Sequence, residues 1–396
     1  MTYSTTFSFR IPTVIEYGAG RLKTLPALVQ TLGGCRILVV GDPGIKAAGI
    51  MDRVMDTLGN ADIQAWEFTD VKSDPAVQSV THGIAKARSL QCDLVVGVGG
   101  GSALDTSKAI GLMLGNTGTI KDYVGIDKVP NAGAPVIAIP TTAGTGSELT
   151  IWSVLSDTES DAKISIGSVF NCPRIGLLDP ELTVSMPAHV TAATGMDALT
   201  HAVESCVCKA NQPITEALTH KAIFLIAKSL RNAVADGQHI AARGDMLLAS
   251  AMAGIAFNAT RLGLVHAFAL PLGNKFGIAH GLANAIMLPS VMAYNASHNI
   301  AGYAAVAELL NDGEKWKKPI DAARYAAHAV ATLRRDVGIT RTLSDFGVTE
   351  RDFDEIIDEA MKSGNVLVNP RFPSREDMAA LLRHGMHGTV EDVQRN

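Results

Sequence analysis

Hydrophobic and polar positions follow two different patterns, and the change falls near residue 183. In the first part, short β-branched runs alternate with amphipathic stretches of helical spacing. The expected strands cover 36–40 (RILVV), 63–68 (IQAWEF) and 93–98 (DLVVGV), and the expected helices cover about 44–58 and 75–90. Alternation of strand and helix is typical of a parallel sheet with crossover helices, so residues 1–183 are predicted to form an α/β domain.

Beyond about residue 187 the strand signals end. Ala- and Leu-rich segments with helical spacing take their place, and Pro180 and Pro187 punctuate the boundary. The expected helices cover roughly 188–209, 213–233, 240–259, 264–274, 281–294, 299–311 and 318–337. Residues 184–396 are therefore predicted to form an all-helical domain.

Composition limits the classes of protein and partner. With 396 residues, 47% of them hydrophobic, the chain can bury two sizeable cores. A net charge of -5 without a long basic run argues against nucleic acid or an anionic membrane as partner. No charged-then-apolar leader is visible, no apolar run reaches the roughly 18 residues that span a bilayer, and five scattered cysteines favour reduced thiols. We expect a soluble, cytoplasmic protein.

Four side chains suggest a metal site. Asp197 and His201 are four residues apart on an expected helix, so both can face one point, and His266 and His280 follow downstream. Three nitrogens and one oxygen suit Fe(II), Zn(II), Co(II) or Ni(II) better than Mg(II) or Ca(II). Because the chain has eleven histidines, an Asp-x3-His pair also arises by chance. However, His266 and His280 lie in Gly- and Ala-rich sequence, where a buried imidazole needs a partner.

The turn VGVGGGSALDTSK, at 96–108, follows a strand and opens a helix. Gly99, Gly100 and Gly101 let the backbone approach a ligand closely, and the helix start, with Ser102 or a neighbour as its cap, offers N–H groups to a pyrophosphate. A simple tight turn is the alternative, because the sequence is not the usual G-x-G-x-x-G.

Two further segments fit a dinucleotide. Asp42 ends the strand RILVVGD, where a carboxylate can bind a ribose and repel a 2′-phosphate, although a loop or cap residue explains it equally well. The segment IPTTAGTGSE, at 139–148, is rich in hydroxyls and could wrap a phosphate or the nicotinamide ribose. Alone, it reads as a plain connection.

Six motifs together resemble the iron-containing (group III) alcohol dehydrogenase family, whose wider fold group includes glycerol dehydrogenase and dehydroquinate synthase. They are GGGSALDTSK, PTTAGTGSE, LLDPELTVSMP, TGMDALTHAVE, AFNATRLGLVHAFA and HGLANAIMLP, and they run in the family order between about residue 10 and about residue 371. The resemblance implies a Rossmann-like NAD-binding domain, a helical metal-binding and substrate domain, an active site in the cleft between them, and a homodimer or larger homo-oligomer.

The same resemblance implies residue roles. Fe(II), or sometimes Zn(II), would be held by Asp197, His201, His266 and His280. The pyrophosphate would contact Gly99, Gly100, Gly101, Ser102 and Asp105, and the nicotinamide half would lie along Thr141, Thr142 and Thr145. Further cofactor contacts fall on Lys163 and Leu178, and Asp42 takes the place of an acidic residue that favours NAD over NADP.

One departure from the family pattern concerns the substrate pocket. Many members read H-A-x-A-H-x-L-G, whereas this chain has Leu270 in place of the second histidine, so a proton must travel by water, the ribose or another group. Arg261 stands where a small residue is common, and it could pair with an anionic substrate tail or form a surface salt bridge. Trp152 and Phe257 lie in segments that line the pocket in relatives, or are simply core.

The favoured function is hydride transfer between NAD(H) and a small alcohol or aldehyde, with the metal polarising the substrate oxygen. A metal-independent reductase of the maleylacetate type is a second possibility, against which the complete ligand set argues. A non-redox lyase or an NAD-binding protein of the same fold group is the third.

Overall fold

The computed structural model describes residues 6–72, 75–159, 162–311 and 316–388. Contacts within the chain divide it into two compact units. One unit is Ile11–Met186, and the other contains the helices from Pro187 onward together with the described residues before Ile11. The first unit is an α/β structure and the second is helical, so the predicted fold class is confirmed.

The larger sheet of the α/β unit is entirely parallel, in the order β1-β9-β6-β4-β2-β3. Its strands are β1 (Val14–Tyr17), β2 (Arg36–Val40), β3 (Gln64–Phe68), β4 (Leu94–Gly99), β6 (Val136–Pro140) and β9 (Ile175–Leu178). The strand order reverses between β2 and β4, because β3 lies on one side of β2 and β4 on the other. In open α/β sheets, ligands bind at the carboxyl ends of the strands beside such a reversal.

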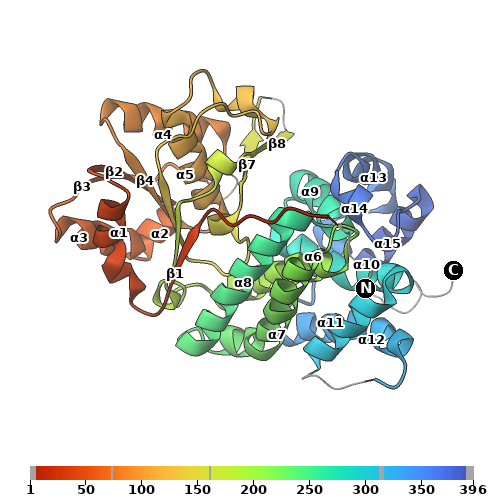
Figure 1. Ribbon diagram of the computed structural model, residues 1–396. Coiled ribbons are helices and arrows are strands. Elements are labelled where there is room, and N and C mark those ends of the chain that lie inside the picture. The colour runs from red at the N-terminus through yellow and green to blue at the C-terminus, as the bar shows by residue number, and fades with distance from the viewer. Residues whose placement is uncertain (1–5, 73–74, 160–161, 312–315, 389–396) are drawn as a thin grey trace. The chain divides into compact units, whose positions relative to one another are not determined.

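Helices cover both faces of this sheet, and side-chain alternation in β2 explains why (Figure 1). Ile37 and Val39 join the core formed with α1 and α3, whereas Leu38 and Val40 join the core formed with α4 and α5. A strand buried on both faces needs consecutive apolar residues, and Ile37–Val40 after the partly buried Arg36 have this pattern. The helices are α1 (Leu25–Thr31), α2 (Pro43–Ala47), α3 (Ile50–Gly59), α4 (Val77–Ser89) and α5 (Gly101–Leu114).

Two features of this unit differ from the expectation. The single helix expected over 44–58 is two helices, because Gly49 adopts a left-handed φ of 72° between α2 and α3. A smaller sheet, in the order β5-β8-β7, was not predicted. It consists of β5 (Gly125–Ile126), β7 (Trp152–Asp157) and β8 (Ala162–Gly167), which are short or only partly buried and so lack a long apolar run.

The helical unit contains every helix expected beyond residue 187, with ends shifted by a few residues at most. Its helices are α6 (Ala188–Val207), α7 (Pro213–Ala235), α8 (Ile240–Thr260), α9 (Leu264–Phe276), α10 (His280–Asn295), α11 (Ile300–Leu310), α12 (Pro319–Asp336), α13 (Phe353–Met361), α14 (Asn365–Val368) and α15 (Arg375–His387). Helices α6, α7 and α8 pack side by side (Figure 1). Helices α13, α14 and α15 were not predicted.

The expectation that no apolar run is long enough to span a bilayer is corrected by α8. Over 18 residues it is long and apolar enough to cross a bilayer, although no such run was expected. Two thirds of that window is nevertheless buried within the protein. Helix α8 therefore has the character of a core helix.

Candidate metal centre and nucleotide-binding turn

Three helices bring together the side chains proposed as metal ligands. Helix α6 supplies Asp197 and His201, α9 supplies His266 near its start, and α10 begins at His280. One donor atom from each residue lies within 4.8 Å of the others. Asp197 Oδ1 is 3.9 Å from His201 Nε2, 3.8 Å from His266 Nε2 and 3.7 Å from His280 Nε2. The predicted metal-ligating group is therefore present.

The environment of Asp197 favours its charged form. Burial opposes the charge, but His201, His280 and His266 together with a hydrogen bond from Asn284 hold the pKa of this carboxyl below its usual range. The carboxylate thus keeps a negative charge at the centre of the cluster, as a metal ligand must.

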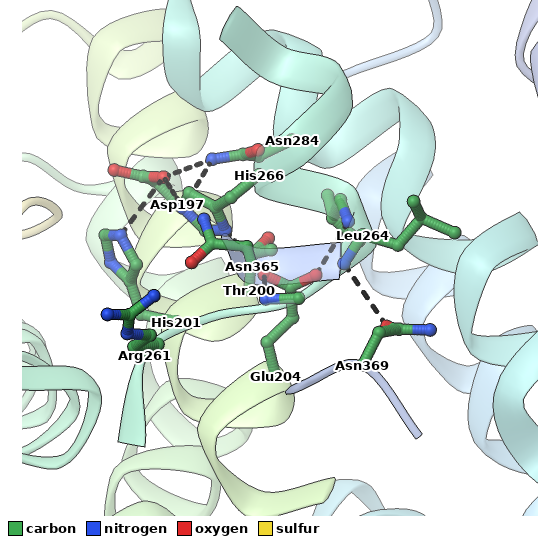
Figure 2. Close-up of polar contacts among 12 residues, drawn as sticks. Asp197, Thr200, His201, Glu204, Arg261, Leu264, His266, Asn284, Asn365 and Asn369 are labelled. Carbon is green, nitrogen blue, oxygen red and sulfur yellow. Dashed lines mark hydrogen bonds and ion pairs between the residues drawn. The ribbon is translucent and has the colours of Figure 1, made fainter. Parts of the chain in front are cut away.

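Asn284, on α10, lies where atoms of three proposed ligands converge. Its Nδ2 donates to Asp197 Oδ1 at 2.7 Å and lies 3.1 Å from His266 Nε2 and 3.2 Å from His280 Nε2 (Figure 2). One N–H₂ group is thus surrounded by lone pairs from three of the four residues. Atoms that converge on a hydrogen-bond donor also suit a cation, so the donor set fits a divalent transition metal.

Glu204 is a further residue of this site that the sequence analysis did not identify. It lies on α6 and is buried, and its Oε2 accepts a 2.6 Å hydrogen bond from His266 Nδ1 (Figure 2). Asp197, His201 and Glu204 occupy positions i, i+4 and i+7 of one helix, hence one face. That spacing was the available signal, but the contact depends on how α9 packs against α6.

The residues proposed for the substrate differ in position. The Phe257 ring stacks on the His201 ring with centroids 4.5 Å apart, so it lies against a ligand. Leu270 follows His266 by four residues on α9 and is 41% exposed, so it lies on the surface of the helical unit rather than in its core. Trp152, in the α/β unit, packs across Gly167, where a Cβ would lie 2.5 Å from its ring.

Arg261 has an unusual backbone at the end of α8. Its φ of 65° and ψ of -169° lie in a region that is essentially restricted to glycine. Within the described part of the chain, its guanidinium makes no hydrogen bond or ion pair, so the surface salt bridge considered above is absent. Nη1 of Arg261 instead packs against Gly364, so closely that a Cβ on Gly364 would lie 2.6 Å from this nitrogen.

The glycine-rich turn and the segment 139–148 lie together at the carboxyl ends of β4 and β6. A Cβ on Gly101 would lie 2.8 Å from Thr145, and one on Gly100 would lie 3.4 Å from Thr142. Gly99 has a φ of 144° and leaves no space for a Cβ, which would lie 2.7 Å from that of Ala103. These glycines are required because two loops and a helix start meet in one place.

The N-cap of α5 is Gly100, which is a neighbour of Ser102 and has no side chain that could cap the helix start. Helix α5 has 14 residues, and its first N–H groups carry the positive end of the helix dipole. A glycine-rich turn that leads into a helix start is the arrangement that binds phosphate groups in dinucleotide folds.

The two acidic residues near this turn make different contacts. Asp42 Oδ1 caps α2 by accepting from Ile45 N at 3.0 Å, and its Oδ2 would lie 3.4 Å from a Cβ on Gly99. Asp105 Oδ1 accepts from Ser147 Oγ at 2.5 Å, and its Oδ2 accepts from Val154 N at 2.9 Å. Asp105 therefore ties α5 to the 147–154 segment.

The remaining residues implied by the resemblance also lie in the α/β unit. Thr141 is buried directly after β6 and donates its N–H to Gly99 O at 3.0 Å. Leu178 is fully buried at the end of β9. Lys163 lies on β8, where partial burial lowers the pKa of its ammonium group.

A parallel α/β unit with a glycine-rich turn at a helix start, and a helical unit that brings together one carboxylate and three imidazoles, define the class of metal-dependent dehydrogenases. Residues 12–180 match the iron-containing alcohol dehydrogenase family, and residues 191–386 match the C-terminal part of the Fe-containing alcohol dehydrogenase family. The chain therefore belongs to the iron-containing alcohol dehydrogenase family, as its motifs predicted.

Relatives match along nearly the whole chain. The 1,3-propanediol dehydrogenase of Klebsiella pneumoniae is 41% identical over 95% of this chain and 98% of its own length. The crystal structure of a 1,3-propanediol oxidoreductase superposes with a TM-score of 0.93 at 41% identity, covering 96% of this chain and all of that one. The sulfoacetaldehyde reductase of Bifidobacterium kashiwanohense, solved with NAD+, has a TM-score of 0.89 at 30% identity, covering 98% of this chain and all of that one.

Proposed function

We propose that this protein interconverts a small alcohol and its aldehyde with NAD(H), using a divalent metal bound by Asp197, His201, His266 and His280. The observation that carries the proposal is the convergence of these donor atoms, within 4.8 Å of one another, in a member of the iron-containing alcohol dehydrogenase family. Fe(II) is the proposed metal, and Zn(II) or another transition ion suits the same donors. The complete donor set argues against a metal-independent reductase.

A bound metal supplies Lewis acidity that stabilises an alkoxide, and a bound nicotinamide accepts or supplies the hydride. The chain's own residues prepare this chemistry. Asp197 stays ionised, and the Phe257 ring holds the His201 imidazole on one side. Oxidation of the alcohol yields aldehyde, NADH and one proton. Because Leu270 cannot carry that proton, the proton would leave by water, the ribose or another group.

The nucleotide is proposed to bind at the carboxyl ends of β2, β4 and β6. Its pyrophosphate would meet the N–H groups of Gly100, Gly101 and Ser102 at the start of α5, where the N-cap is a glycine. Thr141, Thr142 and Thr145 would lie along the nicotinamide half, and Lys163 and Leu178 would add contacts. Because Asp105 is held by Ser147 and Val154, we propose that it supports the turn rather than touching the phosphates.

We propose that Asp42 selects NAD over NADP. Its position after β2, beside Gly99, suits a ribose contact, and its charge opposes a 2′-phosphate. Its role as the cap of α2 is compatible with this, because the cap uses Oδ1 alone.

The substrate pocket is proposed to include Phe257, Arg261, Leu270 and Trp152. Arg261 is the residue that can define a substrate class, because its guanidinium has no acidic partner in the described part of the chain. We propose that it binds an anionic tail, such as the carboxylate of a semialdehyde. A relative that acts on sulfoacetaldehyde, an anionic aldehyde, supports this choice.

The protein is proposed to be a cytoplasmic homo-oligomer. All five cysteines are free, as expected of a reducing compartment. Strand β1 forms an edge of the sheet and exposes Val14, Ile15 and Tyr17 by 56%, 39% and 42%. An apolar edge of this kind is a template for pairing with a second copy. Light scattering of Ile15→Lys would show a smaller particle than the unmodified chain if β1 forms that interface, and an unchanged mass would exclude it.

NADH oxidation by a panel of neutral and anionic aldehydes, measured on chelator-treated and Fe(II)-reloaded protein, tests the proposed function. We expect turnover only after reloading, and His266→Ala should lose metal and activity together. Equal turnover without metal would establish the metal-independent reductase. NADH binding without turnover of any aldehyde would indicate a nucleotide-binding protein, and turnover that regenerates the cofactor would indicate a lyase.

A further inference from the structure

The carboxylate of Glu204 is an acceptor for three buried donors that converge on it. Its Oε2 accepts from His266 Nδ1 at 2.6 Å and from Gly263 N at 2.9 Å, and its Oε1 accepts from Val265 N at 2.7 Å. Glu204 is 4% exposed. A buried carboxylate with three charge-assisted hydrogen bonds is held firmly in one orientation.

We infer that Glu204 is a positioning residue that fixes His266 in the tautomer whose Nε2 can bind the metal. The backbone N–H groups of Gly263 and Val265 donate to one oxygen each, which is the arrangement that suits the carboxylate form, and a carboxylate has no hydrogen to donate. His266 Nδ1 must therefore carry the hydrogen of the short contact. In the neutral imidazole, Nε2 then keeps its lone pair.

The direction of His266 Nε2 agrees with this assignment. It lies 3.1 Å from the donor Asn284 Nδ2 and 3.8 Å from Asp197 Oδ1, on the side of the ring that faces the other ligands. The ring is thus bound at both nitrogens, by an acceptor on one side and by a donor on the other. The inference rests on the proposed metal-dependent function, but the tautomer itself exists in the metal-free protein.

Glu204 also has a second, separable task. The N-cap of α9 is Gly263, which has no side chain to cap the helix. Glu204 instead accepts hydrogen bonds from the N–H groups of Gly263 and Val265. The N–H of Leu264, which lies between them, donates to Asn369 Oδ1 at 3.2 Å (Figure 2). Asn369 therefore shares in capping α9 but makes no recorded contact with His266 in the described part of the chain.

The substitution Glu204→Gln separates the two explanations. An amide has one acceptor oxygen and one donor nitrogen, so it cannot satisfy three donors. His266 can relieve the conflict by moving its hydrogen to Nε2 and accepting from the amide at Nδ1. That tautomer presents N–H to the metal position, so we expect metal affinity to fall 10- to 100-fold, in the range found for outer partners of ligating histidines.

Asn369→Ala is the matched control, because it weakens the cap of α9 without removing a partner of His266. The experiment measures, for both variants, the melting temperature of the metal-free protein, the dissociation constant for Co(II) with its visible absorption band, and the imidazole ¹⁵N shifts. We expect both variants to melt earlier, and only Glu204→Gln to lose Co(II) affinity and show His266 protonated at Nε2. A third variant, Gly263→Ala, has an ordinary extended φ of -140°, but its Cβ would lie 2.7 Å from Glu204 Oε1. It should also weaken Co(II) binding.

Unchanged Co(II) affinity in folded Glu204→Gln, with a melting temperature lowered as in Asn369→Ala, would reduce Glu204 to a helix cap and overturn the inference. If Glu204→Gln does not fold, the inference is tested by the Co(II) affinity of Gly263→Ala and by the ¹⁵N shifts of the unmodified metal-free protein. A hydrogen on His266 Nε2 in the unmodified protein would overturn the inference. Failure of the unmodified protein to bind Co(II) would contradict the proposed function, while those ¹⁵N shifts would still test the tautomer.

Discussion

Asn284 Nδ2 lies 2.7 Å from Asp197 Oδ1, so an amide of α10 binds the carboxylate that α6 contributes to the metal centre. The same nitrogen lies within 3.2 Å of His266 Nε2 and His280 Nε2. In the metal-free protein, this one group satisfies acceptors that a cation would otherwise neutralise. The amide and the metal therefore compete for the same lone pairs.

Asn284→Ala should destabilise the metal-free protein by about 1–3 kcal/mol, because it leaves a buried carboxylate without its donor. The metal-loaded protein should lose less stability, since the metal satisfies the same acceptors. Differential scanning calorimetry with chelator and with Fe(II) would show a larger rise in melting temperature on metal addition than in the unmodified chain. Equal destabilisation in both forms would show that the amide and the metal do not compete.

Arg261→Ala should raise KM for an anionic aldehyde by about 10- to 100-fold while changing KM for a neutral aldehyde of similar length much less. The reason is the loss of a charge-assisted hydrogen bond to the anionic tail. Arg261→Gly should share this loss, but it should be more stable than the alanine variant by about 1–3 kcal/mol, because glycine adopts φ 65° and ψ -169° without strain. Equal changes for charged and neutral aldehydes would remove Arg261 from substrate recognition.

Asp42→Gly and Asp42→Ser should both narrow the preference for NADH over NADPH, on the order of tenfold, because both remove a charge that opposes the 2′-phosphate. Serine keeps a side-chain acceptor for Ile45 N, whereas glycine does not. If both variants show the same ratio of kcat/KM for NADH to kcat/KM for NADPH, the preference depends on the charge of Asp42 and not on its capping of α2. Unchanged discrimination in both would exclude Asp42 from cofactor selection.

Glu148 gives the α/β unit a specific pH dependence. Complete burial raises the pKa of this carboxyl to about 7, although Lys108 partly offsets the rise, and its Oε1 has no hydrogen-bond partner in the described part of the chain. Because the folded pKa lies above that of the unfolded chain, the contribution of Glu148 to stability is fully present below about pH 4.5 and is lost as pH rises toward 7. The loss from this group amounts to about 3 kcal/mol.

Glu148→Gln should remove this contribution, so the stability of the variant relative to the unmodified chain should rise between pH 5 and about pH 7.5. Urea unfolding at several pH values measures the difference. Glu159→Gln, at a carboxyl that is 76% exposed in a surface ion pair, serves as the control and should show little change. A difference between Glu148→Gln and the unmodified chain that does not vary with pH would mean that Glu148 is ionised when folded.

The features of this structure that were predicted from the sequence are those that depend on local patterns. The four residues Ile37–Val40 are all apolar because β2 is buried on both faces there, and Asp197 and His201 share a helix face because of their spacing. Strand β8 alternates weakly, and α14 has only four residues, so neither carries a periodic signal. Contacts such as His266 with Glu204 join residues 62 positions apart and follow from packing alone.

The ligands of the proposed metal come from three helices, and Asp197 and His280 are 83 positions apart in the sequence. The four donor atoms meet only when α6, α9 and α10 have packed together. A metal held by all four residues would therefore require the folded helical unit, and its binding would add to the stability of that unit. Iron and zinc would then compete for a folded site rather than for an unfolded chain.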